Sequence, residues 1–226
     1  MKFDILTLFP DAIHNYSEVS ILGRAQKSRQ IDIRAHDIRD FTLDKQHHVD
    51  DKPYGGGAGM VLQVEPIYRC LESLGLVKDG KPAFAKASAR RRIIIMDPDG
   101  KKFDQKMAHK FSKLDNLVLI CGRYEGFDER VYKFIDERIS VGDFVLAGGE
   151  LPALTIVEST ARLIPGVLGN KESLTEETFV EGVIEYPQYT RPEDFMGLKV
   201  PKILLSGDHK KIEQWRQKNT KRSVKS

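Results

Sequence analysis

The sequence has little of what metal-built, disulfide-built or membrane proteins need. Its 226 residues include two cysteines, Cys70 and Cys121, and neither belongs to a CxxC pair or has a histidine at ligand spacing. This argues against a structural zinc site and a disulfide framework. No apolar run approaches the roughly 20 residues that span a bilayer. The N-terminal MKFDILTLFP lacks the features of a signal peptide. We therefore expect a cytoplasmic protein with reduced thiols and no membrane partner.

The common nucleotide-binding motifs are also missing. There is no GxxxxGK[ST] sequence, and the glycine-rich segment 55–59 fails the GxGxxG pattern because Met60 occupies its last position. The surrounding DDKPYGGGAGM is therefore interpreted as a loop that faces a substrate or a second subunit. Its polar members are Asp50, Asp51, Lys52 and Tyr54. A plain flexible loop is the alternative.

Positive charge is concentrated at the C-terminus. The formal net charge is +3, but residues 199–226 hold nine Lys or Arg against two Asp or Glu, so the remainder carries −4. A basic tail on a slightly acidic body indicates contact with a polyanion such as nucleic acid. A solvated terminus is the alternative interpretation.

Apolar runs alternate with amphipathic stretches, which is typical of a mostly parallel sheet with helices on both faces. The predicted strands are Phe3–Phe9, Ile31–His36, Ile93–Met96, Leu117–Cys121 and Phe144–Leu146. The predicted helices are Pro66–Leu74, Asp104–Lys113, Asp128–Ile135, Glu150–Leu163 and His209–Lys218.

A break follows the fourth predicted helix. Ile164–Gly169 holds a proline and two glycines, and a polar, Glu-rich stretch follows. We therefore predict a first domain over 1–163, a linker or loop over 164–178, and a small, mainly helical second domain over 179–226. The last is too small to bury much core alone, so it should lean on the first domain or on a second subunit.

Three glycine-rich turns lie beside predicted strands. Their sequences are DPDG at 97–100, GRYEG at 122–126 and VGDFVLAGGE at 141–150. Ligands of open α/β sheets bind at the carboxyl ends of strands, and glycine lets the backbone approach a ligand closely. The turns therefore indicate a binding site, although ordinary tight connections are the alternative.

Long segments of the chain resemble one family, the bacterial tRNA (guanine-N1)-methyltransferases of the TrmD family and SPOUT class. The matching stretches are LTLFP, VDDKPYGGGAGM, LICGRYEGFDERV, SVGDFVLAGGELPALTIVESTARLIPGVLG, YPQYTRP and VPKILLSGDHKKIEQWR. They run in the family's order over nearly the whole chain.

The resemblance implies an α/β SPOUT fold with a deep trefoil knot, a rare feature that no periodicity argument predicts. It implies methyl transfer from S-adenosylmethionine to N1 of guanosine 37 of tRNA, beside the anticodon, usually after another guanosine. This modification maintains the reading frame. It also implies a homodimer whose active sites are shared between subunits, and suggests that Mg²⁺ assists.

The resemblance further implies which residues contact the donor. These are Ile95, Met96, Asp97, Pro98, Gly122, Tyr124, Glu125, Val141, Gly142, Asp143, Phe144, Val145, Leu146, Gly148, Gly149 and Pro152.

Three side chains are implied in catalysis. Glu125 matches an acidic residue near the donor's charged end, and Arg162 matches an arginine that steadies charge on guanine O6. The family places an aspartate in the loop after GVLG, where this chain has Glu177, so we expect Glu177 to be the general base. Glu176 is the weaker candidate for that role. For Glu125 and Arg162 the alternative is a surface charge favoured by a helix dipole.

Other departures and alternatives concern the donor turn and the tRNA. The family's first turn usually reads Ser-Pro-Gln-Gly, but this chain has Asp97-Pro98-Asp99-Gly100.

Candidate contacts with tRNA phosphates are residues 90–92, 101–102 and the tail 218–225, and binding through phosphates should weaken as the salt concentration rises. Competing functions are methylation of another RNA position or of a ribose, and RNA binding without catalysis.

Overall fold

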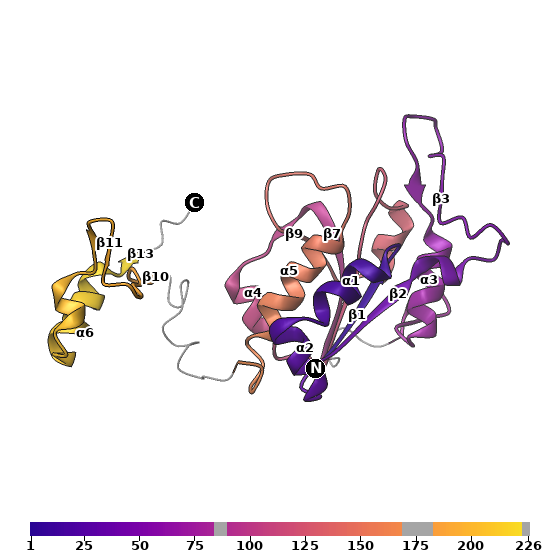
Figure 1. The fold of residues 1–226 in the computed structure, drawn as a ribbon. Coiled ribbons are helices and arrows are strands. Elements are labelled where there is room, and N and C mark those ends of the chain that lie inside the picture. Colours follow the sequence, from indigo (N-terminus) through magenta and orange to yellow (C-terminus); the bar gives the residue numbers. More distant parts are fainter. Residues whose placement is uncertain (84–89, 169–182, 223–226) are drawn as a thin grey trace. The chain divides into compact units, whose positions relative to one another are not determined.

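The computed structural model describes residues 1–83, 90–168 and 183–222 (Figure 1). The chain divides into two compact units, Met1–Gly169 and Asn170–Ser226. The division falls within the predicted linker over 164–178. None of the described helices is long and apolar enough to cross a bilayer.

The first unit is built on a five-stranded, wholly parallel sheet in the order β2-β1-β8-β7-β9. Its strands are β1 (Lys2–Thr7), β2 (Asp32–Asp37), β7 (Arg91–Lys102), β8 (Asn116–Ile120) and β9 (Glu137–Ser140). The predicted α/β class with a parallel sheet is confirmed.

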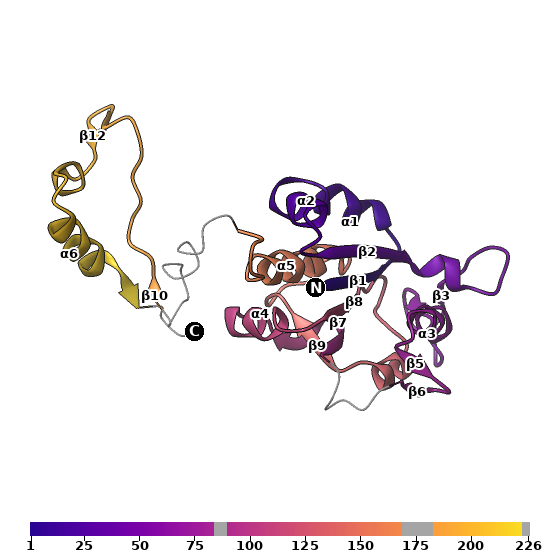
Figure 2. The ribbon, with the colours of Figure 1, turned by 90° about the horizontal axis from the view of Figure 1, so that it is seen from below.

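Helices cover both faces of this sheet, because side chains on each strand alternate between two cores (Figure 2). On β8, Leu117 and Leu119 join one core while Val118 and Ile120 join the other. The first core also takes residues from α1 (Pro10–Ser17), α2 (Ser20–Lys27), α4 (Gln105–Phe111) and α5 (Glu150–Ala161). The second takes residues from η1 (Ile38–Phe41), α3 (Val64–Ser73) and η2 (Glu129–Phe134).

Short antiparallel pairs complete the first unit. They are β3 (Asp50–Asp51) with β4 (Val61–Leu62), and β5 (Val77–Lys78) with β6 (Lys81–Pro82).

Two predicted elements are corrected by the structure. Phe144–Leu146 is not a strand: it lies in the loop between β9 and α5, and Val145 is 83% exposed. The sheet edge is β9 instead, whose sequence ERIS has a single apolar residue and therefore little strand signal. The predicted helix Asp128–Ile135 is the 3₁₀ segment η2, which the Asp128 side chain caps by accepting from Arg130 N–H at 2.9 Å.

The described part of the second unit combines helix and strand. It contains η5 (Lys202–Leu205), α6 (His209–Asn219) and the antiparallel pairs β10 (Val183–Ile184) with β13 (Lys221–Arg222) and β11 (Asp194–Phe195) with β12 (Leu198–Lys199). The ring of Trp215 on α6 packs edgewise against Tyr186 and Tyr189, with centroids 6.5 and 6.3 Å away. Neither α6 nor η5 has a buried residue and Tyr189 is 48% exposed, so the described part of this unit buries little apolar surface, as its size predicts.

Candidate active site

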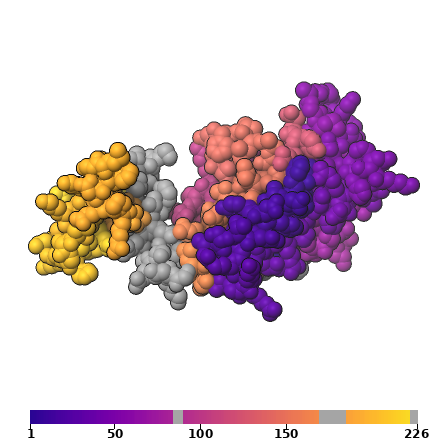
Figure 3. Space-filling model, viewed as in Figure 1, coloured from indigo at the N-terminus to yellow at the C-terminus, as the bar shows by residue number. Residues whose placement is uncertain are grey.

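A pocket of about 340 Å³ opens at the carboxyl ends of β8 and β9 and beside residues 96–98 in the middle of β7. The second and third glycine-rich segments follow β8 and β9, and the first, residues 97–100, lies within β7 between them, so the parallel sheet brings all three together. The volume is in the range of small-molecule sites. In Figure 3 the loop between β9 and α5, coloured salmon, lies at the surface of the first unit.

Most residues implied as donor contacts lie on the pocket wall. They are Met96, Asp97, Pro98, Gly122, Tyr124, Glu125, Val141, Gly142, Phe144, Val145, Leu146, Gly148, Gly149 and Pro152. The structure thus brings together segments more than forty positions apart in sequence. Their contact with a donor stays a prediction.

Two implied contacts do not line the pocket. The Ile95 side chain is fully buried in the core on the α3 face of the sheet. The Asp143 side chain is 79% exposed and pairs with Lys102. Neither side chain faces the pocket, although both flank residues that do.

The sequence prediction missed several wall residues. They are Arg123, Gly126, Phe127, Glu129, Tyr132, Ile139, Ser140 and Ala147. The first three lie within the GRYEGF match and were available to that reasoning. Tyr132 was not, because only the packing of η2 against residues 97–100 of β7 brings it to the pocket.

Gly149 allows the start of α5 to approach the end of β8. A Cβ atom at this position would lie 2.7 Å from Cys121 Cα, a distance that real Cβ atoms do not tolerate. The Gly149 N–H donates to the carbonyl of Gly122 at 2.9 Å. Two glycines from different turns therefore join the end of β8 to the start of α5 in the wall of the pocket.

The Gly-rich loop 55–59 packs against the second turn. The Glu125 N–H donates to Met60 O at 2.9 Å, and the Glu125 side chain lies so close to Gly59 that a Cβ there would be 2.5 Å from it. The loop therefore contacts one wall residue, Glu125, while none of its own residues lines the pocket, and its role toward substrate or a second subunit stays a prediction.

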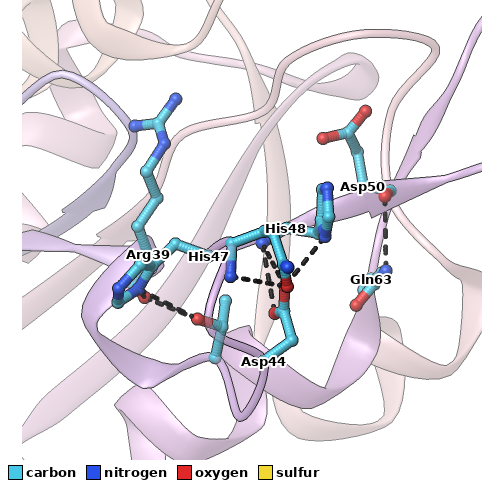
Figure 4. Close-up of polar contacts among 8 residues, drawn as sticks. Arg39, Asp44, His47, His48, Asp50 and Gln63 are labelled. Atoms are coloured by element: carbon cyan, nitrogen blue, oxygen red, sulfur yellow. Dashed lines mark hydrogen bonds and ion pairs between the residues drawn. The ribbon is translucent and has the colours of Figure 1, made fainter.

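Tyr124 holds an uncommon backbone conformation at the pocket, with φ of 58°. Burial raises the pKa of Tyr124, and the negative charge of Asp50, which accepts its hydroxyl hydrogen bond, raises it further. Asp50 is itself fixed, because its carbonyl accepts from Gln63 Nε2 at 3.2 Å (Figure 4). In the preceding segment, residues 44–48, the His48 Nδ1 atom lies 2.8 Å from Asp44 Oδ2, so this contact joins the two ends of the segment (Figure 4).

The LTLFP segment supports the same site from β1. Thr7 Oγ1 donates to Glu150 Oε1 at 2.8 Å and accepts from Phe9 N–H at 2.9 Å. The other Glu150 oxygen accepts from Arg123 at 3.0 Å, and the Arg123 guanidinium lies 4.4 Å from the centre of the Phe9 ring. The motif therefore fixes the first residue of α5 and the second turn together.

Arg162 lies at the opposite end of α5 from the pocket. The pocket contains Gly149 and Pro152, at the start of the helix, and Arg162 is the C-cap. Twelve helical residues separate these ends by about 18 Å. Within one chain the structure does not bring Arg162 to the pocket. Glu177 and Glu176 lie outside the described residues.

Several candidate phosphate contacts have acidic partners on the first unit. Arg90 pairs with Asp115 at 3.5 Å and Arg92 with Glu137 at 3.9 Å. Lys102 pairs with Asp143. These pairs reduce the net positive charge that residues 90–92 and 101–102 present to a polyanion. Within the described ranges no three His, Cys, Asp or Glu side chains are grouped so that they could hold a metal.

Comparisons with known proteins agree over the full length. The family model described as tRNA (Guanine-1)-methyltransferase TrmD matches residues 1–226. A tRNA (guanine-N(1)-)-methyltransferase of Lactobacillus johnsonii is 50% identical, over 99% of this chain and 88% of that protein. One of Clostridium acetobutylicum is 48% identical, over 100% of this chain and 88% of that protein. The crystal structure of a tRNA (m1G37) methyltransferase from Aquifex aeolicus superposes with a TM-score of 0.77 and 40% identity, over 95% of this chain and 87% of that one.

Proposed function

The chain belongs to the tRNA (guanine-1)-methyltransferase family, and from that premise we propose how its residues carry out methyl transfer to N1 of guanosine 37 in tRNA. That activity, which depends on S-adenosylmethionine, is the one the family and its named relatives support for this chain. The observation that carries the proposal is the pocket that the family's three glycine-rich segments form together.

The pocket fits S-adenosylmethionine as donor. Its volume suits a small molecule, and its wall mixes exposed backbone at glycines with apolar side chains such as Pro98 and Pro152. The carboxylates of Asp97, Glu125 and Glu129 also line it, which favours a ligand with positive charge. The donor supplies a methyl group already activated on a sulfonium.

The protein must make guanine N1 nucleophilic. That nitrogen carries a proton, so a base has to accept the proton as the N1–methyl bond forms and the methyl–sulfur bond breaks. We assign this role to the Glu177 carboxylate. Negative charge then develops on guanine O6, where the Arg162 guanidinium stabilises it. Glu125 holds the donor's charged end from the turn that packs on Gly59.

The separation of Arg162 from the pocket favours a homodimer with shared sites. Because the length of α5 lies between Arg162 and Gly149, one chain cannot bring both to the same methyl group. A second copy, related by a two-fold axis, supplies the arginine and the general base to each pocket.

The donor pocket forms within a trefoil knot. The support is that residues 141–149 leave the edge strand β9 and return to the centre of the sheet, where Gly149 meets the Cys121–Gly122 backbone. Gly100 makes a second close approach, since a Cβ there would lie 2.4 Å from Ile139 N. Close crossings of backbone at glycine are what a knotted chain requires.

The parts of the chain divide these tasks. Residues 1–163 form the domain that binds the donor, and residues 164–178 carry the general base. Residues 179–226, which include the basic tail, bind tRNA. The enzyme works in the cytoplasm. A guanosine before the target completes the preferred substrate. The family resemblance suggests that Mg²⁺ assists. Among the described residues no three His, Cys, Asp or Glu side chains are grouped to hold it, and the steps above use the chain's own residues.

A radiolabelled methyl-transfer assay tests the function. Unmodified tRNA with guanosine at position 37 should accept label from S-adenosylmethionine, and the same tRNA with adenosine at that position should not. Equal labelling of both transcripts would favour an enzyme for another RNA position. No labelling with normal tRNA binding would favour an RNA-binding protein without catalysis.

A further inference from the structure

One polar cluster at the pocket is not accounted for by the mechanism above. It consists of Asp97, Tyr132 and Arg138, and it joins the irregular middle of β7 to η2 and β9. The Tyr132 hydroxyl donates to Asp97 Oδ2 at 2.8 Å. Arg138 Nη1 lies 3.9 Å from the same oxygen and donates to Asp99 Oδ2 at 3.5 Å, so it holds both carboxylates of residues 97–100. Asp97 Oδ1 accepts from the Asp99 N–H at 2.9 Å.

The carboxylate at the centre of the cluster is largely shielded, while the Arg138 side chain is 45% exposed. The Asp97 side chain is 14% exposed, whereas Asp99 is 87% exposed. The Arg138 guanidinium also lies 5.1 Å from the centre of the Tyr132 ring, so it contacts both other members of the cluster. Burial raises the pKa of Tyr132, and its hydrogen bond to Asp97 raises it further, so the phenol remains a hydrogen-bond donor at neutral pH.

The backbone that the cluster holds is irregular. Met96 and Lys101 both pair with Ile139, so residues 97–100 bulge out of the sheet between them. The far end of the bulge is fixed where Gly100 presses on the Ile139 backbone. The near end has Asp97 as its anchor, and Pro98 between the two ends lines the pocket. The bulge therefore depends on side-chain contacts where strand pairing is lost.

We propose that Tyr132 and Arg138 are positioning residues for the methyl donor, which act through Asp97 by fixing the pocket wall formed by residues 97–100. This inference rests on the proposed donor site. It assigns a role to the Asp-Pro-Asp-Gly turn that departs from the family's usual Ser-Pro-Gln-Gly. In this chain a carboxylate, a phenol and a guanidinium fix the wall.

The test combines direct binding with kinetics. Calorimetry with S-adenosylhomocysteine measures pocket affinity without turnover, and steady-state assays give kcat and the two KM values. For Tyr132→Phe we expect a donor KM and an S-adenosylhomocysteine Kd about tenfold above wild type, as for loss of a hydrogen bond to a charged group. The kcat and the KM for tRNA should stay within about twofold of wild type, because only the donor wall changes.

A matched control is Tyr68→Phe. The Tyr68 hydroxyl also bonds a carboxylate, Glu72 at 3.2 Å, but it lies on α3 and does not line the pocket. This variant should keep the wild-type donor KM. A double-mutant cycle then separates indirect from direct action: in an Asp97→Ala background, which has no side-chain acceptor for the Tyr132 hydroxyl, Tyr132→Phe should raise the donor KM less than twofold.

The outcomes are distinct. If wild type binds S-adenosylhomocysteine and Tyr132→Phe binds it equally well, the positioning role is wrong. If the effect of Tyr132→Phe persists undiminished in the Asp97→Ala background, Tyr132 does not act through Asp97. If Tyr132→Phe fails to fold, Arg138→Gln supplies the same test from an exposed position, with an expected rise in donor KM. If wild type itself does not bind S-adenosylhomocysteine, the proposed donor site fails first.

Discussion

The Arg123 guanidinium donates to the Glu150 carboxylate at 3.0 Å, and this carboxylate side chain is only 5% exposed. The pair ties the turn after β8 to the first residue of α5, 27 positions later. A negative charge at a helix N-terminus is favourable in itself, and the Thr7 hydroxyl satisfies the second carboxylate oxygen. The link between the turn after β8 and the start of α5, both of which contribute to the pocket wall, therefore depends on the buried Glu150 carboxylate.

Replacing that charge should destabilise the first unit. We expect Glu150→Gln to lower the free energy of unfolding by about 2 kcal/mol, because Arg123 loses its partner while remaining partly buried. Urea unfolding measures the change. The control is Glu65→Gln, which breaks an exposed pair with Arg69 at 3.1 Å and should cost about 0.5 kcal/mol or less. Equal effects of the two substitutions would contradict the role of Glu150.

Asp4 predicts a pH dependence of stability. It is fully buried on β1, and its oxygens contact His36 Nε2 at 2.8 Å, Lys2 Nζ at 2.9 Å and Asn116 Nδ2 at 3.0 Å. Burial alone raises the pKa of Asp4, but these three partners outweigh it and hold the pKa below its ordinary value. A lowered carboxyl pKa contributes stability at neutral pH, and that contribution is lost as the pH falls through the folded-state pKa.

The comparison of wild type with Asp4→Asn measures this contribution. The variant should be less stable at pH 7, and the difference in unfolding free energy should shrink below about pH 4. Urea unfolding at several pH values gives the difference, with Asp32→Asn as an exposed control on the neighbouring strand. A difference that stays constant down to pH 3 would refute the account of Asp4.

The general base is tested by Glu177→Gln. Since the amide cannot accept the N1 proton, we expect single-turnover methyl transfer to slow by about 100-fold or more, with tRNA affinity unchanged. Glu176→Gln is the matched control and should keep most of the rate. Glu177→Asp restores the family's usual residue and should remain active. Full activity of Glu177→Gln would show that the base is another group.

Shared active sites are tested with mixed dimers. One subunit carries Arg162→Ala, and the other carries Val145→Arg, which places bulk and positive charge in the pocket at an 83% exposed residue. Each homodimer should be inactive. Mixed dimers purified by two tags should recover about half of the wild-type activity, because one pocket then faces an intact Arg162. Inactive mixed dimers would mean that each subunit uses its own arginine.

Much of the sheet was predictable because its strands are continuous apolar runs. Ile93–Met96 and Leu117–Cys121 have this pattern, as buried parallel strands do, and both predicted strands are confirmed as parts of β7 and β8. The sequence did not predict α1 and α2, since each is only eight residues long and few of its residues are buried. It also mistook the apolar Phe144–Leu146 for a strand, although these side chains line the pocket.

The pocket was predictable from its glycines and from the family resemblance, but its supporting contacts were not. Thr7 and Glu150 are 143 positions apart, and nothing local in either segment indicates that they bond. Tyr132 likewise meets Asp97 only because η2 packs beside the bulge in β7. Such contacts depend on tertiary packing, which periodicity does not encode. Arg162 shows a second limit, because the role proposed for it depends on a second copy of the chain, and the fold of one chain does not bring it to the pocket.

Nucleoside analysis of the reaction product tests the central claim most directly. Unmodified tRNA that has been incubated with the protein and S-adenosylmethionine is digested to nucleosides, which are then separated and identified by mass spectrometry against methylguanosine standards. We predict that 1-methylguanosine forms from position 37 and that it disappears when this guanosine is replaced. A ribose-methylated nucleoside, or methylation at another guanine atom or position, would contradict the account.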